Sequence, residues 1–251
     1  MNDGRCRARR VDGVGEPFAR RSRSATAGPM RALCELAHAT WHVDCCCRVT
    51  ARSVPQPAWR FFMSGKLANC KVAILAVDGF EEAELVEPQR ALSAEGAQVD
   101  VISQQPGEIQ GFRHVDKGAR VKVDHTFDDA KQGDYDAIVL PGGVVNGDAM
   151  RMIPAAREFV TAAIGADKPV AVICHGGWLL VSAGLVDGRT MTSWPSLQDD
   201  IRNAGGKWVD ERVVRDGNLI TSRKPDDLDA FNGALIECLA ADRAHAPRER
   251  P

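Results

Sequence analysis

Several features that mark large classes of protein are absent from the sequence. No run of 18 or more apolar residues occurs, so no transmembrane helix is predicted. The arginine pair Arg20 and Arg21 is not followed by an apolar stretch, so no secretory signal is supported. Neither the glycine-rich nucleotide-binding motifs nor the zinc motif H-E-x-x-H is present. We therefore expect no nucleotide cofactor and no metal.

Basic residues are not in excess, and cysteine is sparse over most of the chain. The 251 residues include 32 Lys or Arg and 34 Asp or Glu, which gives a net charge of −2. Eleven arginines lie in residues 1–62, so the rest is net acidic, and we expect neither a nucleic-acid nor a membrane partner. Beyond residue 62 only Cys70, Cys174 and Cys238 occur, each alone, which favours a reducing compartment and a cytoplasmic location.

The first part of the chain differs in kind from the rest. Residues 1–65 show no helix or strand periodicity and are predicted to be a disordered, Arg-rich leader. The leader is either an organelle transit peptide or non-native upstream translation with Met63 as the true start, and we favour the second. A catalytic domain is predicted at 66–241 and a disordered tail at 242–251.

Apolar runs alternate with helical periodicity through residues 66–241. Predicted strands lie at 71–77, 98–103, 136–140 and 169–173. Predicted helices lie at 81–95, where Pro88 kinks or restarts the helix, at 155–166, at 178–183 and beyond Pro225. This alternation predicts an α/β fold with three layers and a mostly parallel sheet, in which ligands bind beyond the carboxyl ends of the strands.

Cys174 ends one of these strands and is followed at once by His175 and two glycines. A cysteine that ends an apolar strand is usually a core residue. A tight turn directly into a helix, however, is typical of a nucleophile elbow, which lifts the side chain into the crevice. A position at a helix start also favours the thiolate. We therefore predict that Cys174 is a reactive nucleophile.

Two other strand ends carry groups that suit the same crevice. Gly142 and Gly143 offer N–H groups for an oxyanion, although a simple Pro-Gly-Gly turn is the alternative. Glu84 lies one turn into the first helix and is predicted to project its carboxyl into the crevice, although acids at a helix start are also favoured by the dipole. A protonated carboxyl there would donate to a thiolate and act as general acid or base.

Taken together, these segments resemble the PfpI family, the intracellular cysteine peptidases and deglycases of the class I glutamine-amidotransferase-like superfamily. The resemblance spans nearly all of residues 69–240 and none of the leader. The segments that carry it are KVAILAVDGFEEAEL (71–85), GEIQGF (107–112), YDAIVLPGG (135–143), KPVAVICHGGWLL (168–180), GRTMTSWPSLQDDIRNAG (188–205) and VDERVVRDGNLITSRKPDDLDAFN (209–232).

The resemblance implies a flavodoxin-like sandwich with a catalytic cysteine. By position, Cys174 would be the nucleophile, His175 its partner and Glu84 the carboxyl that contacts the cysteine. Gly143 and the His175 amide would form the oxyanion hole. The third acid of the triad would come from a neighbouring subunit, and Asp148 is the nearest match, so a homodimer or larger homo-oligomer is implied.

Two further positions follow from the same resemblance. Trp194 falls where the family carries an aromatic at the pocket mouth, with a core residue as the alternative. Gly177 stands where the family usually has proline, and we expect this departure to loosen the elbow without removing a reacting group.

The predicted function is that of a cysteine-dependent hydrolase. It would act as a peptidase, or as a deglycase or glyoxalase on glyoxal and methylglyoxal adducts, with small aldehydes, glycated proteins or short peptides as substrates. The alternative is a redox-responsive stress protein or holdase in which Cys174 oxidises. Glutamine amidotransfer is disfavoured because no H-x-E pair lies in the last part of the domain.

Overall fold

The structure is a computed structural model, and it describes residues 65–245. Nearly all of the predicted leader, and the last residues of the predicted tail, lie outside the described residues. The tail prediction began too early: α6 (Leu228–His245) continues to His245, so residues 242–245 are helical. Among the described residues, no helix is long and apolar enough to cross a bilayer.

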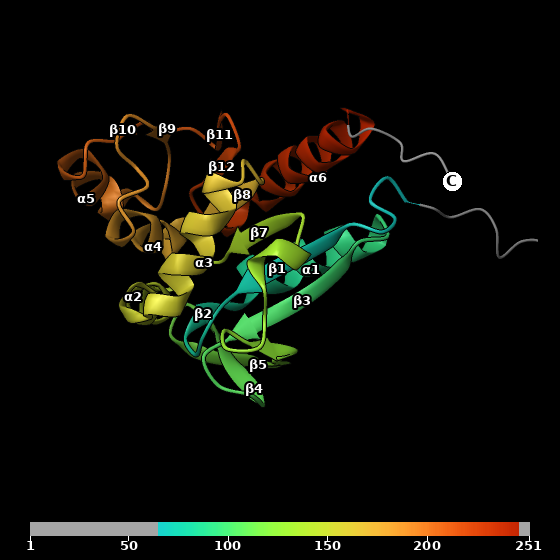
Figure 1. Ribbon diagram of the computed structural model, residues 1–251. Coiled ribbons are helices and arrows are strands. Elements are labelled where there is room, and N and C mark those ends of the chain that lie inside the picture. The colour runs from blue at the N-terminus through green and yellow to red at the C-terminus, as the bar shows by residue number, and fades with distance from the viewer. Residues whose placement is uncertain (1–64, 246–251) are drawn as a thin grey trace, which may run out of the picture. The chain divides into compact units, whose positions relative to one another are not determined.

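A seven-stranded sheet forms the middle of the fold (Figure 1). Its order is β11-β12-β8-β7-β1-β3-β6, and all neighbours are parallel except β11 and β12. The strands are β1 (Lys71–Leu75), β3 (Gln98–Ser103), β6 (His125–Thr126), β7 (Ala137–Leu140), β8 (Val170–Ile173), β11 (Val213–Asp216) and β12 (Leu219–Ser222). The predicted α/β class with a mostly parallel sheet is confirmed.

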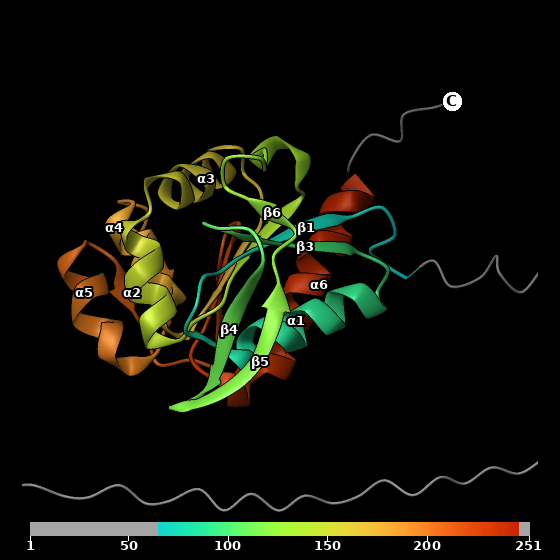
Figure 2. The same ribbon diagram turned by 90° about the horizontal axis from the view of Figure 1, so that it is seen from below.

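Helices cover both faces of this sheet and complete the three layers (Figure 2). On one face lie α1 and α6, and on the other lie α2, α3 and α4. The remaining helix bounds are α1 (Glu82–Ala94), α2 (Val144–Met152), α3 (Pro154–Gly165), α4 (Gly177–Ser182) and α5 (Gln198–Asn203).

The central strands are apolar throughout because each face of the sheet packs against helices. In β1, Val72 and Ile74 join one buried cluster and Ala73 and Leu75 join the other. Side chains alternate between the faces of a strand, so a continuous apolar run serves two cores. This is why the strands could be predicted from hydrophobicity alone.

Two small sheets were not predicted. One contains β2 (Phe80–Glu81) and the hairpin of β4 (Glu108–Arg113) and β5 (Asp116–Lys122). The other pairs β9 (Thr190–Met191) with β10 (Lys207–Trp208). The hairpin is rich in charged residues, and most of β5 is exposed, so it lacks the apolar pattern that reveals a strand.

The first helix differs from its prediction in one respect. Pro88 lies inside α1, and the helix continues from Glu82 to Ala94 as a single element, so the predicted restart does not occur. Proline removes one backbone donor and disfavours a helix interior. Pro88 and Leu85 are buried against the rest of the core, and this packing outweighs the local preference.

Candidate active site

The segments that follow three neighbouring strands lie at the carboxyl ends of the sheet and form a pocket. The strands β8, β7 and β1 are neighbours in this order, so the segments that follow them lie side by side. The pocket has a volume of about 500 Å³. Its wall is built from residues of these segments, of the β4–β5 hairpin and of the chain that follows β9 and β12: Gly79, Glu81, Glu84, Phe112, His114, Gly143, Val144, Val145, Cys174, His175, Trp178, Trp194, Ser196 and Pro225.

Cys174 occupies a strained turn between β8 and α4. Its φ is 58°, a left-handed conformation that non-glycine residues rarely adopt. Such strain is held by the surrounding structure and is characteristic of functional sites. Gly177, the position where proline was expected from the resemblance, has φ −58°, which lies within the range that a proline ring imposes. The elbow therefore has the predicted shape despite the glycine.

The Cys174 sulfur is enclosed by three kinds of group. The side chain is 7% exposed and lines the pocket. The backbone N–H groups of Gly143 and His175 donate to the sulfur, and the Glu84 carboxyl lies within hydrogen-bonding reach of it. The His175 Nδ1 atom lies 3.2 Å from Sγ. The structure thus brings together Cys174, His175, Glu84 and Gly143, four of the predicted site residues.

Glu84 is a fully buried carboxyl, and no cationic side chain pairs with it among residues 65–245. Its Oε2 atom accepts a hydrogen bond from the Gly142 N–H at 2.9 Å. Burial raises the pKa of Glu84 to about 8, and the negative charge of Glu81 adds to this effect. At neutral pH Glu84 is therefore mostly protonated, and its O–H group is available as a donor or acid beside the sulfur.

The resting thiol is less acidic than the helix-start argument predicted. Burial raises the pKa of Cys174, and a charge on Glu84 raises it further, whereas the two N–H groups lower it. Desolvation therefore opposes the thiolate that the helix start and the two N–H groups favour. The thiol must lose its proton when a substrate is attacked, and a protonated Glu84 removes the charge that would oppose this step.

His175 packs against two tryptophan rings. Its ring centroid lies 5.0 Å from that of Trp178 and 6.0 Å from that of Trp194, the latter pair being stacked. Burial lowers the pKa of His175, so the imidazole is neutral at neutral pH and Nδ1 can accept the thiol proton. On the far side of the ring, Nε2 lies 3.3 Å from the Ser196 hydroxyl. Sequence reasoning missed Ser196 because a single serine in a loop carries no signal.

The two glycines of the Pro-Gly-Gly turn have different roles. Gly143 has φ 91° and its N–H lies beside the Cys174 sulfur, so its oxyanion role stays a prediction. The Gly142 N–H is instead used by Glu84, so the prediction of a second oxyanion donor there is wrong. A Cβ atom at Gly142 would lie 2.5 Å from Glu84 Oε2 and 2.6 Å from Cys174 Cβ, so glycine is required for this close approach.

Of the two remaining predicted site residues, Trp194 lines the pocket and Asp148 does not. Trp194 is 38% exposed and lines the pocket, as expected for an aromatic at its mouth. Asp148 lies exposed on α2 and is not part of the pocket wall of this chain. It reaches no site residue within the chain, so its role stays a prediction that depends on a second copy.

The geometry agrees with a comparison against known proteins. Residues 70–238 match the model of the DJ-1/PfpI family. The chain belongs to this family. It is 42% identical over 169 residues to the protein named Deglycase TK1284 of Thermococcus kodakarensis, and the match covers 67% of this chain and 99% of that protein. It is 37% identical over 169 residues to the putative cysteine protease YraA of Bacillus subtilis, covering 67% and 98%.

Solved structures agree with the DJ-1/PfpI assignment. A two-domain protein of Anabaena variabilis, with DJ-1/ThiJ/PfpI-like and ferritin-like domains, superimposes with a TM-score of 0.65 at 34% identity. The superposition covers 72% of this chain and 52% of that one, so this chain spans about half of that two-domain protein.

Asn146 is a second residue near the site that sequence reasoning missed. This buried amide lies on α2, where its Oδ1 accepts the Val77 N–H at 2.8 Å. Its Nδ2 donates to the carbonyl oxygens of Pro141 and Gly142, each at 3.0 Å. The side chain therefore joins the end of β1 to the glycine turn that faces Cys174.

Replacing Asn146 with alanine is expected to loosen this junction. The change leaves one N–H and two carbonyl groups without their partner, which costs about 3 kcal/mol of unfolding free energy. Turnover should fall as well, because the turn that carries the Gly143 N–H is no longer fixed. Denaturant unfolding and steady-state kinetics measure both effects, with the exposed Asn203→Ala on α5 as the control. Equal stability of the two variants would contradict this role.

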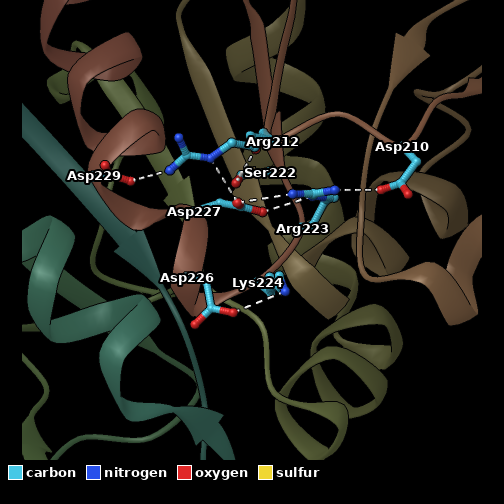
Figure 3. A network of polar contacts seen from close by, with 8 residues as sticks. All are labelled: Asp210, Arg212, Ser222, Arg223, Lys224, Asp226, Asp227 and Asp229. Carbon is cyan, nitrogen blue, oxygen red and sulfur yellow. Dashed lines mark hydrogen bonds and ion pairs between the residues drawn. The ribbon is translucent and has the colours of Figure 1, made fainter.

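An ionic network surrounds Pro225, a residue of the pocket wall (Figure 3). Buried Asp227 accepts hydrogen bonds from Arg223 Nε at 2.9 Å and from Arg212 Nε at 3.2 Å. Burial opposes its charge, but these two guanidinium groups hold the pKa of Asp227 below its usual range. The network joins the start of β11 and the end of β12 to the start of α6, and so fixes Pro225 at the pocket. Its members are Asp210, Arg212, Ser222, Arg223, Lys224, Asp226, Asp227 and Asp229.

Proposed function

We propose that the protein is a cysteine-dependent hydrolase that acts on dicarbonyl compounds and their adducts. The observation that carries this proposal is the arrangement around Cys174: a strained thiol in a pocket, two backbone donors and a neutral carboxyl beside it. A nucleophile, an oxyanion site and a general acid are the parts that addition to a carbonyl carbon requires.

The first step is addition of sulfur to a carbonyl carbon. As the Cys174 sulfur bonds to the aldehyde carbon of methylglyoxal, its proton passes to His175 Nδ1, 3.2 Å away. The imidazole then holds its other proton toward the Ser196 hydroxyl. The charge that develops on the aldehyde oxygen is stabilised by the N–H groups of Gly143 and His175. The Glu84 O–H gives this oxygen its proton, so the product is a neutral hemithioacetal beside a Glu84 carboxylate and a His175 imidazolium.

The second stage converts this adduct to a thioester and hydrolyses it. A proton leaves the former aldehyde carbon, an enediol forms, and a proton is delivered to the neighbouring carbon, which gives a lactoyl thioester of Cys174. The Glu84 carboxylate left by the first step takes the proton from the former aldehyde carbon while the His175 imidazolium protonates the ketone oxygen. Glu84 then delivers its proton to the neighbouring carbon, and the imidazole takes the remaining hydroxyl proton as the thioester carbonyl forms. Water then cleaves the thioester and releases lactate and the thiol. The sum is methylglyoxal plus water giving lactate, with no external oxidant or reductant.

The size and the wall of the pocket limit the substrates. A volume of about 500 Å³ accepts a small aldehyde, an adducted side chain or a short peptide. The names of the DJ-1/PfpI relatives, deglycase and putative cysteine protease, are consistent with both carbonyl adducts and peptides. The neutral acid beside the thiol favours the dicarbonyl reaction, because that reaction needs a proton carried between adjacent carbons.

We also propose that a second copy of the chain completes the site. Asp148 lies on α2, whose first residues Val144 and Val145 line the pocket and are 56% and 62% exposed. Exposed apolar residues at the pocket mouth suit contact with another subunit. The mass in solution, measured by light scattering, tests this: a strict monomer that remains fully active would contradict it.

The function is tested with the full chain and three assays in parallel. Lactate formation from methylglyoxal, release of free amine from a glycated peptide, and cleavage of an unmodified peptide are measured at equal enzyme concentration. We expect turnover of the first two. Cleavage of the unmodified peptide alone would replace the dicarbonyl function with a peptidase function.

The redox alternative is supported by the same donors. Gly143 N–H, His175 N–H and the Glu84 O–H surround the sulfur, and all three could bond the oxygens of a sulfinate. It gains support if the folded protein consumes no substrate in any of the three assays while peroxide oxidises Cys174 stoichiometrically. Under that outcome the hydrolase proposal fails.

A further inference from the structure

The pocket wall contains acidic side chains but neither lysine nor arginine. The wall contains two carboxyl groups, those of Glu81 and Glu84, and two imidazoles. Glu84 is mostly protonated at neutral pH, because burial raises its pKa to about 8. The negative charge of the pocket therefore resides on Glu81.

No ion pair neutralises the charge of Glu81 within the described part of the chain. The next residue, Glu82, forms an ion pair with Arg113 at 2.9 Å. Glu81, in contrast, has no lysine or arginine partner among residues 65–245; its Oε2 accepts only the His114 backbone N–H, at 3.1 Å. The negative charge of Glu81 nevertheless acts on the reacting groups, since it helps to raise the pKa of Glu84.

The aromatic wall adds a second feature that suits a cation. Trp194 is partly exposed at the pocket mouth, and an indole face attracts guanidinium and ammonium groups. Arg151 lies over the ring of the other wall tryptophan, Trp178, at 5.6 Å and donates to Ser182, so its charge is held by the protein. The indole of Trp194 has no such protein cation among the described residues.

We propose that Glu81 makes the pocket selective for adducts that keep a positive charge beside the reacting carbon. Such adducts form when a dicarbonyl adds to an arginine guanidinium or a lysine amine. Substrates with a carboxylate or phosphate at the same place would meet a negative charge in a partly desolvated pocket and bind poorly. This inference rests on the proposed function for its chemistry, but its charge selection can be measured by binding alone.

The first test measures binding and needs no turnover. Nα-acetylarginine amide and Nα-acetylcitrulline amide have nearly the same shape, and only the first is charged. Quenching of tryptophan fluorescence by each compound gives its affinity, because Trp178 and Trp194 line the pocket. We expect the arginine compound to bind about tenfold more tightly, as for a charge-assisted hydrogen bond. In Glu81→Gln this preference should largely vanish.

The second test measures selectivity in turnover. The ratio of kcat/KM for the methylglyoxal adduct of Nα-acetylarginine amide to that for methylglyoxal itself is compared between wild type and Glu81→Gln. We expect the ratio to fall about tenfold in the variant and, in the wild type, to decrease with added salt. Glu108→Gln, which removes one exposed acid from β4 outside the pocket, controls for net charge.

The outcomes separate this inference from the function on which it rests. If wild type and Glu81→Gln show the same preference in both tests, the inference is overturned while methylglyoxal turnover still supports the hydrolase. If no substrate is consumed but the arginine compound binds selectively through Glu81, the proposed function fails and the charge selection stands.

Discussion

Cys174→Ala is expected to abolish turnover of methylglyoxal, with kcat/KM falling about 10⁴-fold or more. The reason is that the sulfur forms the covalent bond, and the neighbouring donors cannot act on a bond that never forms. Lactate production by the full chain measures the loss. The folded structure should be kept, because alanine can still be accommodated at the end of β8.

Cys238→Ala provides the matched control for this substitution. Cys238 is another buried cysteine and lies on α6, outside the pocket wall. Cys174 and Cys238 belong to the same core cluster, and each replacement removes one thiol group from it. Any general effect on packing should therefore appear in both variants. We expect Cys238→Ala to keep wild-type turnover. An active Cys174→Ala variant would contradict the nucleophile assignment.

Glu84→Gln is expected to lower kcat/KM for methylglyoxal by about 10²- to 10³-fold at neutral pH, the range typical of losing a general acid or base. Glutamine has nearly the same shape, and its amide oxygen can still accept the Gly142 N–H. It cannot carry a proton between the carbons of the adduct. The effect should fall mainly on kcat, because the substrate still fits the pocket.

The same substitution also changes how stability depends on pH. The pKa of Glu84 is raised to about 8 in the folded protein from 4.5. The contribution of the neutral carboxyl is therefore fully present below pH 4.5 and is lost as the pH rises toward 8, because the unfolded chain ionises first. Glu84→Gln lacks this loss. As the pH rises from 4.5 to 8, the unfolding free energy of Glu84→Gln should therefore increase relative to that of wild type, by up to about 5 kcal/mol.

Glu87→Gln on the same helix is the control for both effects. Its carboxyl is partly exposed and pairs with Arg90 on the surface of α1. We expect wild-type activity and a wild-type pH profile of stability from it. Unchanged activity in Glu84→Gln would show that the carboxyl is not the proton carrier, and parallel stability profiles would show that Glu84 ionises normally in the fold.

The features that could be predicted from sequence are those that repeat along the chain or stand at fixed places in it. The β1, β7 and β8 strands serve two cores at once, so hydrophobicity reveals them. Cys174 could be found because a cysteine between an apolar strand and two glycines requires a particular backbone turn. That turn is present, with φ 58°.

Other features depend on distances that the sequence does not encode locally. Asn146 and Ser196 matter because they meet the Pro-Gly-Gly turn and His175 in space. The use of the Gly142 N–H by Glu84, 58 positions away, could not be foreseen from either segment. The elevated pKa of the Cys174 thiol likewise follows from burial by several elements together.

Covalent capture tests the central claim most directly. The full-length protein is mixed with methylglyoxal, quenched in acid during turnover, digested and mapped by mass spectrometry. We expect the mass of one methylglyoxal on the peptide that contains Cys174, and its loss on the time scale of lactate release. Continued lactate formation with Cys174 unmodified throughout would contradict a mechanism that passes through this thiol.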